Sequence, residues 1–358
     1  MTASDISSLR LSIQQISSHQ FNQAHEVVKW FGGIQAQDYP AAKWALGLRL
    51  KNITQTQIES EIAAKKFVRT WMFRGTLHFI ATDDVNWMMD LIAPGIISKF
   101  KGRHRELGLT TDVLSKAEKV IVTMLSGDKA ISRKNLFEEL EQNGVATKEQ
   151  KGIHLMLWAS YNKLICHGPT EGKQFTYALY NDWIAKNGTI PRDEALAKLA
   201  LRYFTGHGPA TLQDFMWWSG LGVNDTKKGL EAVRSQLMVA TVEGQEYFMH
   251  PELPELKKTS VKAFLLPAFD EFYLAYKNRN ISLESHHHST VASVNGIFFP
   301  TIVVGNRIVG LWKKEIKKNS VLIDLKAFIE LKNSQKDLIA KAAKDYGRFL
   351  GMKTEVIE

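Results

Sequence analysis

Residues 211–249 read TLQDFMWWSGLGVNDTKKGLEAVRSQLMVATVEGQEYFM, and this stretch decides the fold. Thr211 is a favourable helix N-cap, and Glu243-Gly244 is a favourable turn between two strand-like runs. With the residues just before it, the stretch predicts three helices and then a hairpin: helices over 194–204, 211–218 and 225–236, and strands over 237–241 and 246–249. This order is typical of a winged helix, whose third helix enters a nucleic-acid groove and whose hairpin is the wing.

The same order of elements occurs twice more upstream. The middle of the chain, with Ser132 as an N-cap, predicts helices over 110–126, 133–140 and 148–161 and a hairpin of 164–167 and 174–177. The N-terminal region follows the order more loosely, with helices over 9–16, 23–31 and 40–48, an extra helix over 55–65, and strands over 67–73 and 76–81. We therefore expect three winged-helix units in tandem.

The last quarter of the chain predicts a small β-rich domain. Gly305-Asn306 is a two-residue hairpin signal, and the strand-like runs end in one long helix: strands over 262–266, 301–304, 307–312 and 321–325, and a helix over 333–350. The expected fold class is α+β, with a β-barrel-like C-terminal domain. The expected domains are winged helix 1 over 1–108, winged helix 2 over 109–190, winged helix 3 over 191–255, and the β-rich domain over 256–358.

Composition narrows the function classes. The 358 residues contain 46 Lys and Arg against 37 Asp and Glu, a net charge of +9. A polyanion such as DNA is a favoured partner on that ground, and a mildly basic protein with dispersed charges is the alternative. No apolar run approaches the ~20 residues of a membrane-spanning helix, so no membrane partner is expected. The single cysteine, Cys166, predicts a reducing, cytoplasmic compartment, in association with the nucleoid if the protein is bacterial.

Sequence motifs for common cofactors are missing. The chain has no P-loop, no GxGxxG after a strand, no CxxC pair and no HExxH helix. The run His286-His287-His288 lies in a polar segment without a carboxylate or cysteine spaced to complete a metal site. We therefore expect neither a metal nor a cofactor.

Two glutamines lie between the first predicted helices. Gln35-Ala36-Gln37 follows the helix-breaking pair Gly32-Gly33 and precedes Pro40, which can begin the next helix. In a non-helical turn both amides could face one cavity, where an amide can hold a water molecule and a sugar or base. The alternative is that the two side chains only cap the neighbouring helix ends.

Two further segments carry candidate DNA contacts. In the strand predicted over 67–73, Arg69, Trp71 and Phe73 share one face, and Arg74 and His78 beyond it can reach a phosphate or a base. Near the end of a predicted helix, four cations fall within seven residues: Lys99, Lys101, Arg103 and Arg105. Such a run suits phosphate contacts, although solvated arginines and a solvated helix face are the alternatives.

These segments resemble the AlkZ/YcaQ-like family of winged-helix DNA glycosylases. Members carry a Gln-apolar-Gln or Gln-apolar-Asp motif, here Gln35 to Gln37, and a later Arg-Gly-Thr-Leu-His stretch, here Arg74 to His78. The resemblance extends over about residues 10–315 through Gly208-Pro209-Ala210-Thr211, Trp218-Ser219-Gly220-Leu221, Leu265 to Asp270, and Val304 to Arg307 with Gly310 and Trp312.

The resemblance implies removal of alkylated bases from double-stranded DNA by a monofunctional glycosylase, with unhooking of interstrand crosslinks in some members. It implies that Gln35 and Gln37 are catalytic. The residues expected at the DNA are Arg69, Trp71, Arg74, Thr76, His78, Lys99, Lys101, Arg103 and Arg105.

The second motif position favours a particular substrate. Gln37 is neutral where other members have an aspartate, so it can orient a water molecule but cannot act as a carboxylate base. This suits a leaving group that is already good, such as an N7- or N3-alkylated purine, whose positive charge weakens the glycosidic bond. A non-catalytic winged-helix regulator is the alternative function. The chain has no coiled-coil heptads, and we expect a monomer.

Overall fold

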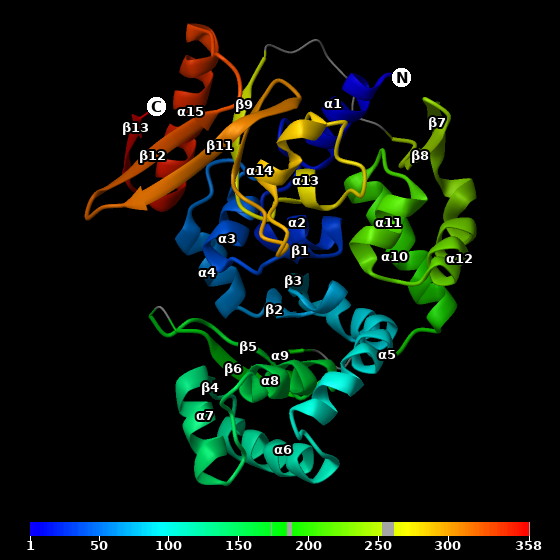
Figure 1. Cartoon of the computed structure of the whole chain (residues 1–358), viewed down its shortest axis with the longest axis vertical. Helices are drawn as coiled ribbons and strands as arrows, with labels where there is room; N and C mark the ends of the chain where they lie inside the picture. Colours follow the sequence, from blue (N-terminus) through cyan, green and yellow to red (C-terminus); the bar gives the residue numbers. More distant parts are fainter. Residues whose placement is uncertain (173, 185–187, 253–260, 358) are drawn as a thin grey trace. The chain divides into compact units, whose positions relative to one another are not determined.

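The computed structural model describes residues 1–172, 174–184, 188–252 and 261–357 of an α+β protein (Figure 1). The chain forms two compact units. Unit 1 is Met1–Ile58 together with the chain from Leu196 onward, and unit 2 is Glu59–Ala195. Two helices contain the unit boundaries, α4 (Gln55–Ala63) and α10 (Arg192–His207). Among the described residues, no helix is both long and apolar enough to cross a membrane.

Unit 2 is built around an antiparallel arrangement of short strands in the order β3-β2-β5-β6-β4. These are β2 (Phe67–Trp71), β3 (Leu77–Ala81), β4 (Ala130–Ser132), β5 (Ile165–His167) and β6 (Thr176–Leu179). The helical segments are η1 (Phe73–Gly75), α5 (Thr82–Glu106), α6 (Thr111–Leu125), α7 (Arg133–Gln142), α8 (Lys151–Tyr161) and α9 (Tyr180–Trp183). Ser132 caps α7 as predicted, because its side chain accepts the N–H of Asn135.

Unit 1 begins with α1 (Ala3–Ile13), α2 (Ala24–Phe31), β1 (Ile34–Gln35) and α3 (Tyr39–Gly47). After α10 come α11 (Leu212–Ser219), α12 (Val223–Val233), η2 (Arg234–Gln236), β7 (Met238–Val242) and β8 (Gln245–Met249). The predicted Thr211 cap is confirmed as a capping box, in which Thr211 and Asp214 each accept the other's backbone N–H.

The C-terminal part of unit 1 is a curled sheet in the order β13-β12-β11-β10-β9. Its elements are β9 (Ala263–Leu266), α13 (Glu271–Leu274), η3 (Ser285–His287), α14 (His288–Val291), β10 (Thr301–Val304), β11 (Arg307–Ile316), β12 (Ser320–Ala327), α15 (Asn333–Leu350) and β13 (Lys353–Ile357). Helix α15 packs along β9 and joins β12 to β13, which pair in parallel. The sheet therefore curls without closing into a barrel, since β9 and β13 are its two edges.

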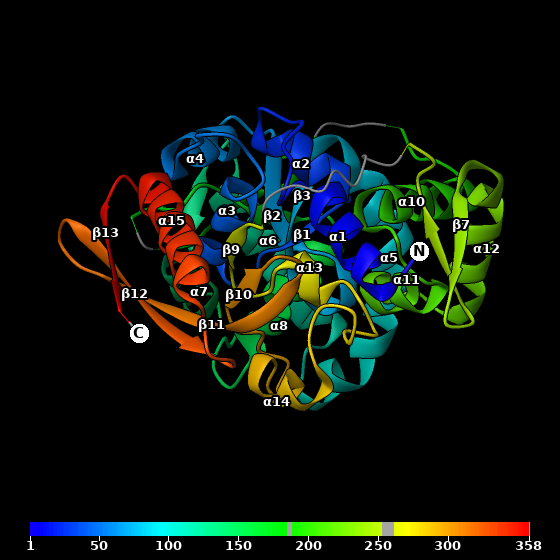
Figure 2. The ribbon, with the colours of Figure 1, turned by 90° about the horizontal axis from the view of Figure 1, so that it is seen from above.

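Helix α1 connects the parts of unit 1. Its Leu11 packs in one apolar cluster with Phe264 and Phe272 of the C-terminal part. Its Ile6 packs in another cluster with Tyr247 of the β7–β8 hairpin. Figure 2 shows α1 between the C-terminal sheet and the helices α10 and α11. The N-terminal helix thus buries apolar surface on two sides, which ties chain segments far apart in sequence into one unit.

Candidate functional site

The glutamine motif lies between two helix ends that other residues cap. Gly32 ends α2 in the left-handed conformation, with φ 77°. Asp38 begins α3, and its carboxylate accepts the N–H of Ala41 at 3.0 Å. Between them Gln35 is buried, at 6% exposure, and Gln37 is exposed. Gly32 and Asp38 therefore cap these two helix ends, and the catalytic role of Gln35 and Gln37 stays a prediction.

A buried carboxylate holds the backbone of the motif. The N–H of Gln35 donates to Oε1 of Glu271 at 3.1 Å, and the indole N–H of Trp218 donates to Oε2 at 3.1 Å. Nε2 of His207 lies 3.4 Å from the same Oε2. Burial lowers the pKa of His207 below its ordinary value, and the neighbouring Glu271 carboxylate opposes that shift. Neither Glu271 nor His207 was predicted from the sequence as a site residue.

An ion pair lies next to this carboxylate. Arg49 donates to both oxygens of Asp270, at 2.8 and 2.9 Å, and both side chains are almost fully buried. Asp270 also caps α13 by accepting the N–H of Phe272 at 2.9 Å. The pair thus fixes the start of the helix whose first residue is Glu271. The signal in the sequence was the Leu265 to Asp270 motif, which ends one residue before Glu271.

In unit 2, the Arg74 to His78 segment forms a tight turn. Arg74 has φ 58° and Gly75 has φ 79°, so both lie in the left-handed region. The N–H of Met72 donates to the carbonyl of Thr76 at 2.9 Å, and the Tyr161 hydroxyl donates to the carbonyl of Met72. Arg74 and Thr76 are half-buried. Arg74 and Gly75 thus form the turn between β2 and β3.

Three of the expected DNA contacts in this hairpin are buried. The guanidinium of Arg69 lies 4.2 Å from the ring centroid of Phe175, and the Trp71 ring lies 5.3 Å from that of His167. His78 is fully buried, with Nδ1 3.0 Å from the carbonyl oxygen of Thr76. Phe73 lies beyond the end of β2 in η1, so it does not continue the strand face expected from the sequence. Their role at DNA stays a prediction.

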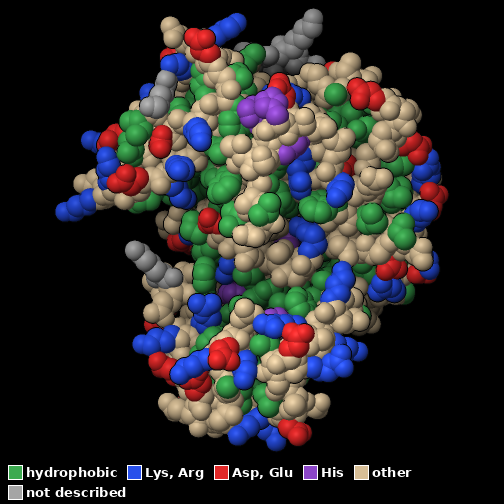
Figure 3. Space-filling model, viewed as in Figure 1, with side chains coloured by type: hydrophobic (Ala, Val, Ile, Leu, Met, Phe, Trp, Pro, Cys, Tyr) green, Lys and Arg blue, Asp and Glu red, His purple; other side chains and the backbone are tan. Residues whose placement is uncertain are grey.

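The four cations of residues 99–105 lie in the last turns of α5 and are exposed. Lys99 and Arg103 are one turn apart, as are Lys101 and Arg105, and the two pairs are rotated by about 200° around the helix. Arg103 donates to Glu106 at 2.8 Å and to Gln150 at 3.0 Å. Figure 3 shows Lys and Arg side chains with Asp and Glu among them over the surface of unit 2.

Two histidines lie beside these cations. The rings of His104 and His154 are 5.5 Å apart, and Phe100 contacts both. Burial lowers the pKa of each histidine, and the neighbouring positive charge adds to the shift, from His154 at His104 and from Arg103 at His154. The two histidines therefore add little positive charge beside the α5 cations at neutral pH.

The histidines of the run 286–288 contact neighbouring side chains. His288 contacts the Tyr273 hydroxyl at 2.7 Å and Asn280 at 2.8 Å, and His287 stacks on Phe328. Within the described ranges, no group of three His, Cys, Asp or Glu side chains could hold a metal ion. Burial raises the pKa of the Cys166 thiol to about 12, which disfavours the thiolate form that a nucleophile needs.

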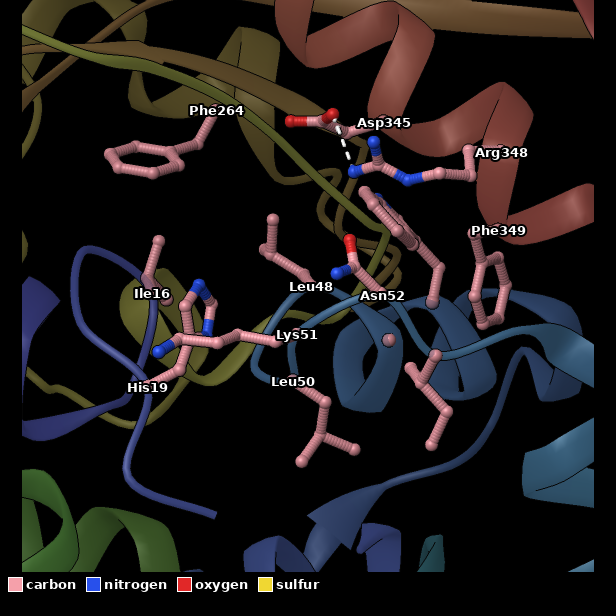
Figure 4. Close-up of a pocket in the computed structure, with 13 residues that line it drawn as sticks. Ile16, His19, Leu48, Leu50, Lys51, Asn52, Phe264, Asp345, Arg348 and Phe349 are labelled. Atoms are coloured by element: carbon pink, nitrogen blue, oxygen red, sulfur yellow. Dashed lines mark hydrogen bonds and ion pairs between the residues drawn. The ribbon is translucent and has the colours of Figure 1, made fainter. Parts of the chain in front are cut away.

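Figure 4 shows a separate pocket of about 200 Å³ in unit 1. Trp44, Phe264 and Phe349 give it apolar walls, while Lys51 and Arg348 line it with positive charge. Arg348 donates to Asp345 at 2.8 Å across the pocket edge. None of the site residues predicted from the sequence lines this pocket.

The model of the family "DNA glycosylase AlkZ-like" matches residues 28–349. An interstrand DNA cross-link repair glycosylase of Streptomyces sahachiroi is 27% identical over 310 residues, which are 81% of this chain and 82% of the relative. The solved structure of the Streptomyces sahachiroi DNA glycosylase AlkZ has the same fold, with a TM-score of 0.80, 22% identity and full coverage of both chains.

Fold and sequence thus define the class of this protein as a DNA glycosylase. The chain belongs to the AlkZ-like family, and the resemblance found in the sequence is confirmed. Its substrate is accordingly DNA.

Proposed function

We propose that this protein is a monofunctional glycosylase that hydrolyses the N-glycosidic bond of N7- or N3-alkylated purines in double-stranded DNA. The observation that carries the proposal is the placement of Gln35 and Gln37 between helix ends capped by Gly32 and Asp38. Unhooking of an interstrand crosslink is the same bond cleavage on a bulkier base, and the name of the Streptomyces relative supports including it.

The reaction needs little from the protein beyond positioning. The bond between C1′ and the base nitrogen breaks, its electron pair neutralises the cationic base, and an oxocarbenium-like sugar forms. Gln35 and Gln37 hold a water molecule and the sugar edge in line, and the water oxygen then bonds to C1′ and loses its proton to solvent. Neither amide can protonate a departing base, so a normal base, which leaves poorly, survives. No metal or cofactor takes part in this scheme.

We further propose three tandem winged helices with the boundaries 1–108, 109–190 and 191–255, followed by the domain 256–358. The element orders α6-α7-α8-β5-β6 and α10-α11-α12-β7-β8 support the second and third units. The exposed cations Lys99, Lys101, Arg103 and Arg105, with Arg74 and Thr76, would contact phosphates, while buried Arg69, Trp71 and His78 would support the hairpin. We expect a monomer, which light scattering can check. The single cysteine suggests that the protein works in the reducing cytoplasm.

The test is release of free base from a duplex that contains N7-methylguanine, with and without a chelator. We expect free modified base and an abasic site, unaffected by the chelator and strongly reduced in Gln35→Ala and Gln37→Ala. Gln245→Ala is the matched control, because it makes the same change on an exposed strand. Normal binding of damaged DNA with wild-type release in either motif variant would remove the proposed catalytic role.

A further inference from the structure

The buried carboxylate of Glu271 joins three segments of unit 1. Glu271 is the first residue of α13 and is 1% exposed. Its partners include groups from β1, α10 and α11: the backbone of Gln35, the ring of His207 and the indole of Trp218. Gln35 precedes Glu271 by 236 residues in the sequence. Burial of a carboxylate costs free energy unless its oxygens are hydrogen-bonded. The N–H groups that Glu271 accepts offset that cost.

Two acceptors are required at this point. Oε1 takes the N–H of Gln35, and Oε2 takes the N–H of Trp218, both at 3.1 Å. A glutamine there has one acceptor and would turn its NH₂ group toward one of two N–H donors. An aliphatic side chain would leave both donors without this acceptor. A carboxylate of this length offers one oxygen to each donor.

The surroundings hold that carboxylate still. The ring of His207 stacks on Tyr203, with centroids 4.7 Å apart, and its carbonyl accepts the Tyr276 hydroxyl at 2.7 Å. Gln14 donates to the same hydroxyl at 2.8 Å and accepts from Arg49 at 3.3 Å. The chain of contacts therefore leads from the Arg49–Asp270 pair back to Glu271, and buried hydrogen-bonded networks of this kind restrict the motion of their members.

We propose that Glu271 is a positioning residue for base excision. By accepting the N–H of Gln35, it fixes the short backbone segment from which Gln35 and Gln37 project. This inference rests on the proposed function. Positioning is the whole contribution of a neutral Gln-Ala-Gln motif, so a shift of its backbone is expected to lower the rate of the chemical step. A misplacement of about 1 Å can cost about 100-fold in rate.

The first test compares Glu271→Gln with wild type on the N7-methylguanine duplex. We expect kcat to fall by about 10- to 100-fold, while KM and the affinity for damaged DNA change by less than about threefold, because only the alignment is impaired. Glu246→Gln, the same change on exposed β8, is the matched control and keeps the wild-type rate. An effect confined to KM would overturn the proposal.

A double variant separates position from stability. In Glu271→Gln the single amide oxygen is shared between the N–H of Gln35 and that of Trp218. Adding Trp218→Phe removes the second donor, so the oxygen can face Gln35 alone. We expect Glu271→Gln/Trp218→Phe to recover at least part of the missing kcat although it unfolds at a lower temperature. A double variant as slow as the single one would overturn positioning through this hydrogen bond.

Hydrogen exchange at the Gln35 amide gives a readout that does not depend on activity. We expect exchange at Gln35 to be slow in wild type and at least about tenfold faster in Glu271→Gln, with recovery in the double variant. Unchanged exchange, or faster exchange with normal kcat, would overturn the inference. If wild-type protein releases no base from any alkylated duplex, the proposed function fails, while the exchange result still reports whether Glu271 holds the motif.

Discussion

Charged residues are used in opposite ways in two regions of this glycosylase. Near the glutamine motif of unit 1, the side chains of Arg49, Asp270 and Glu271 are buried. Arg49 donates to both oxygens of Asp270, and Glu271 accepts the N–H of Gln35. In the last turns of α5 in unit 2, Lys101 and Arg105 are exposed, and no polar contact of their side chains is found within the described ranges. Buried charges fix positions, because leaving one unpaired is costly, whereas exposed cations attract a polyanion and contribute little to folding.

The largest expected effect is on the buried side of this comparison. Asp270→Ala removes the partner of Arg49 and the cap of α13 together, and leaves a guanidinium buried without its carboxylate. We expect the free energy of unfolding to fall by about 3–5 kcal/mol. Urea denaturation followed by tryptophan fluorescence measures it.

Asp345→Ala is the control for that variant. It breaks an ion pair with Arg348 that is also 2.8 Å long. This pair is exposed to solvent, with 60% of the Arg348 side chain and 45% of the Asp345 side chain accessible. We expect a decrease in the free energy of unfolding below about 1 kcal/mol. Equal decreases in the two variants would mean that burial does not determine how much an ion pair contributes to stability.

The second prediction concerns the exposed side. Because the α5 cations form two pairs on different faces of the helix, one duplex cannot contact all four in the same way. We expect Lys101→Ala/Arg105→Ala to reduce the salt dependence of DNA binding by about 0.9 in slope for each phosphate that the variant no longer neutralises. Lys99→Ala/Arg103→Ala should reduce it less, since Arg103 is engaged by Glu106 and Gln150.

Binding titrations at several salt concentrations measure these slopes. Neither pair variant should change the thermal unfolding temperature by more than a degree or two, because the side chains are exposed. A large decrease in stability with an unchanged slope would assign these cations to the fold instead of to DNA.

Much of the local structure could be predicted from the sequence, because local signals determine it. The caps at Ser132 and Thr211 and the hairpin turn at Gly305-Asn306 lie where the pattern indicated. The helix that carries Lys99 to Arg105 was predicted without bounds, and it is the 25-residue α5, which contains Pro94. The helix nevertheless continues through that proline to Glu106.

The site was harder to predict than the elements. The glutamine motif could be found because its residues are adjacent in sequence, and the family resemblance identified it. Glu271 could not, because a contact across 236 residues leaves no periodic pattern. Strand alternation also failed to sort the residues of β2 into buried and exposed faces, since all of them are buried. Sequence alone therefore did not show which arginines are accessible.

The third prediction concerns a buried titratable group in unit 2. If burial determines how such a group affects stability, a buried histidine of unit 2 should also make stability depend on pH. His167 of unit 2 is buried beside Arg69, Arg133, Trp71 and Tyr177. Burial, reinforced by the Arg69 charge, lowers its pKa well below the ordinary 6.5. Below pH 6.5 the unfolded chain binds a proton that the folded chain does not, so stability falls as the pH falls.

The stability that neutral His167 provides is fully present above about pH 7. It is lost progressively as the pH falls from there toward the lower pKa of the folded state. We expect His167→Phe to flatten the dependence of unfolding free energy on pH by up to about 1.4 kcal/mol per pH unit in that window. His104 and His154 act in the same direction, so the difference between wild type and variant isolates His167. Parallel curves for the two proteins would contradict the assignment.

The smallest expected effect concerns Arg74, which combines a structural role in a turn with a proposed role in DNA binding. Arg74 is a candidate phosphate contact, and its backbone lies in the left-handed region at φ 58°. Arg74→Ala and Arg74→Gly both remove the cation, so both should lower the salt slope of DNA binding equally, by about 0.9. Only glycine relieves the backbone conformation, so Arg74→Gly should be more stable than Arg74→Ala by about 1 kcal/mol.

Thermal unfolding and salt titration of the two variants separate the roles of Arg74. If the slopes differ, the turn geometry and not the charge determines binding at this hairpin. If the slopes fall equally and the stabilities differ, the strained turn serves to present the charge, because an arginine is retained where glycine folds more easily. An unchanged slope in both variants would remove Arg74 from the DNA interface and leave the α5 cations as its charged residues.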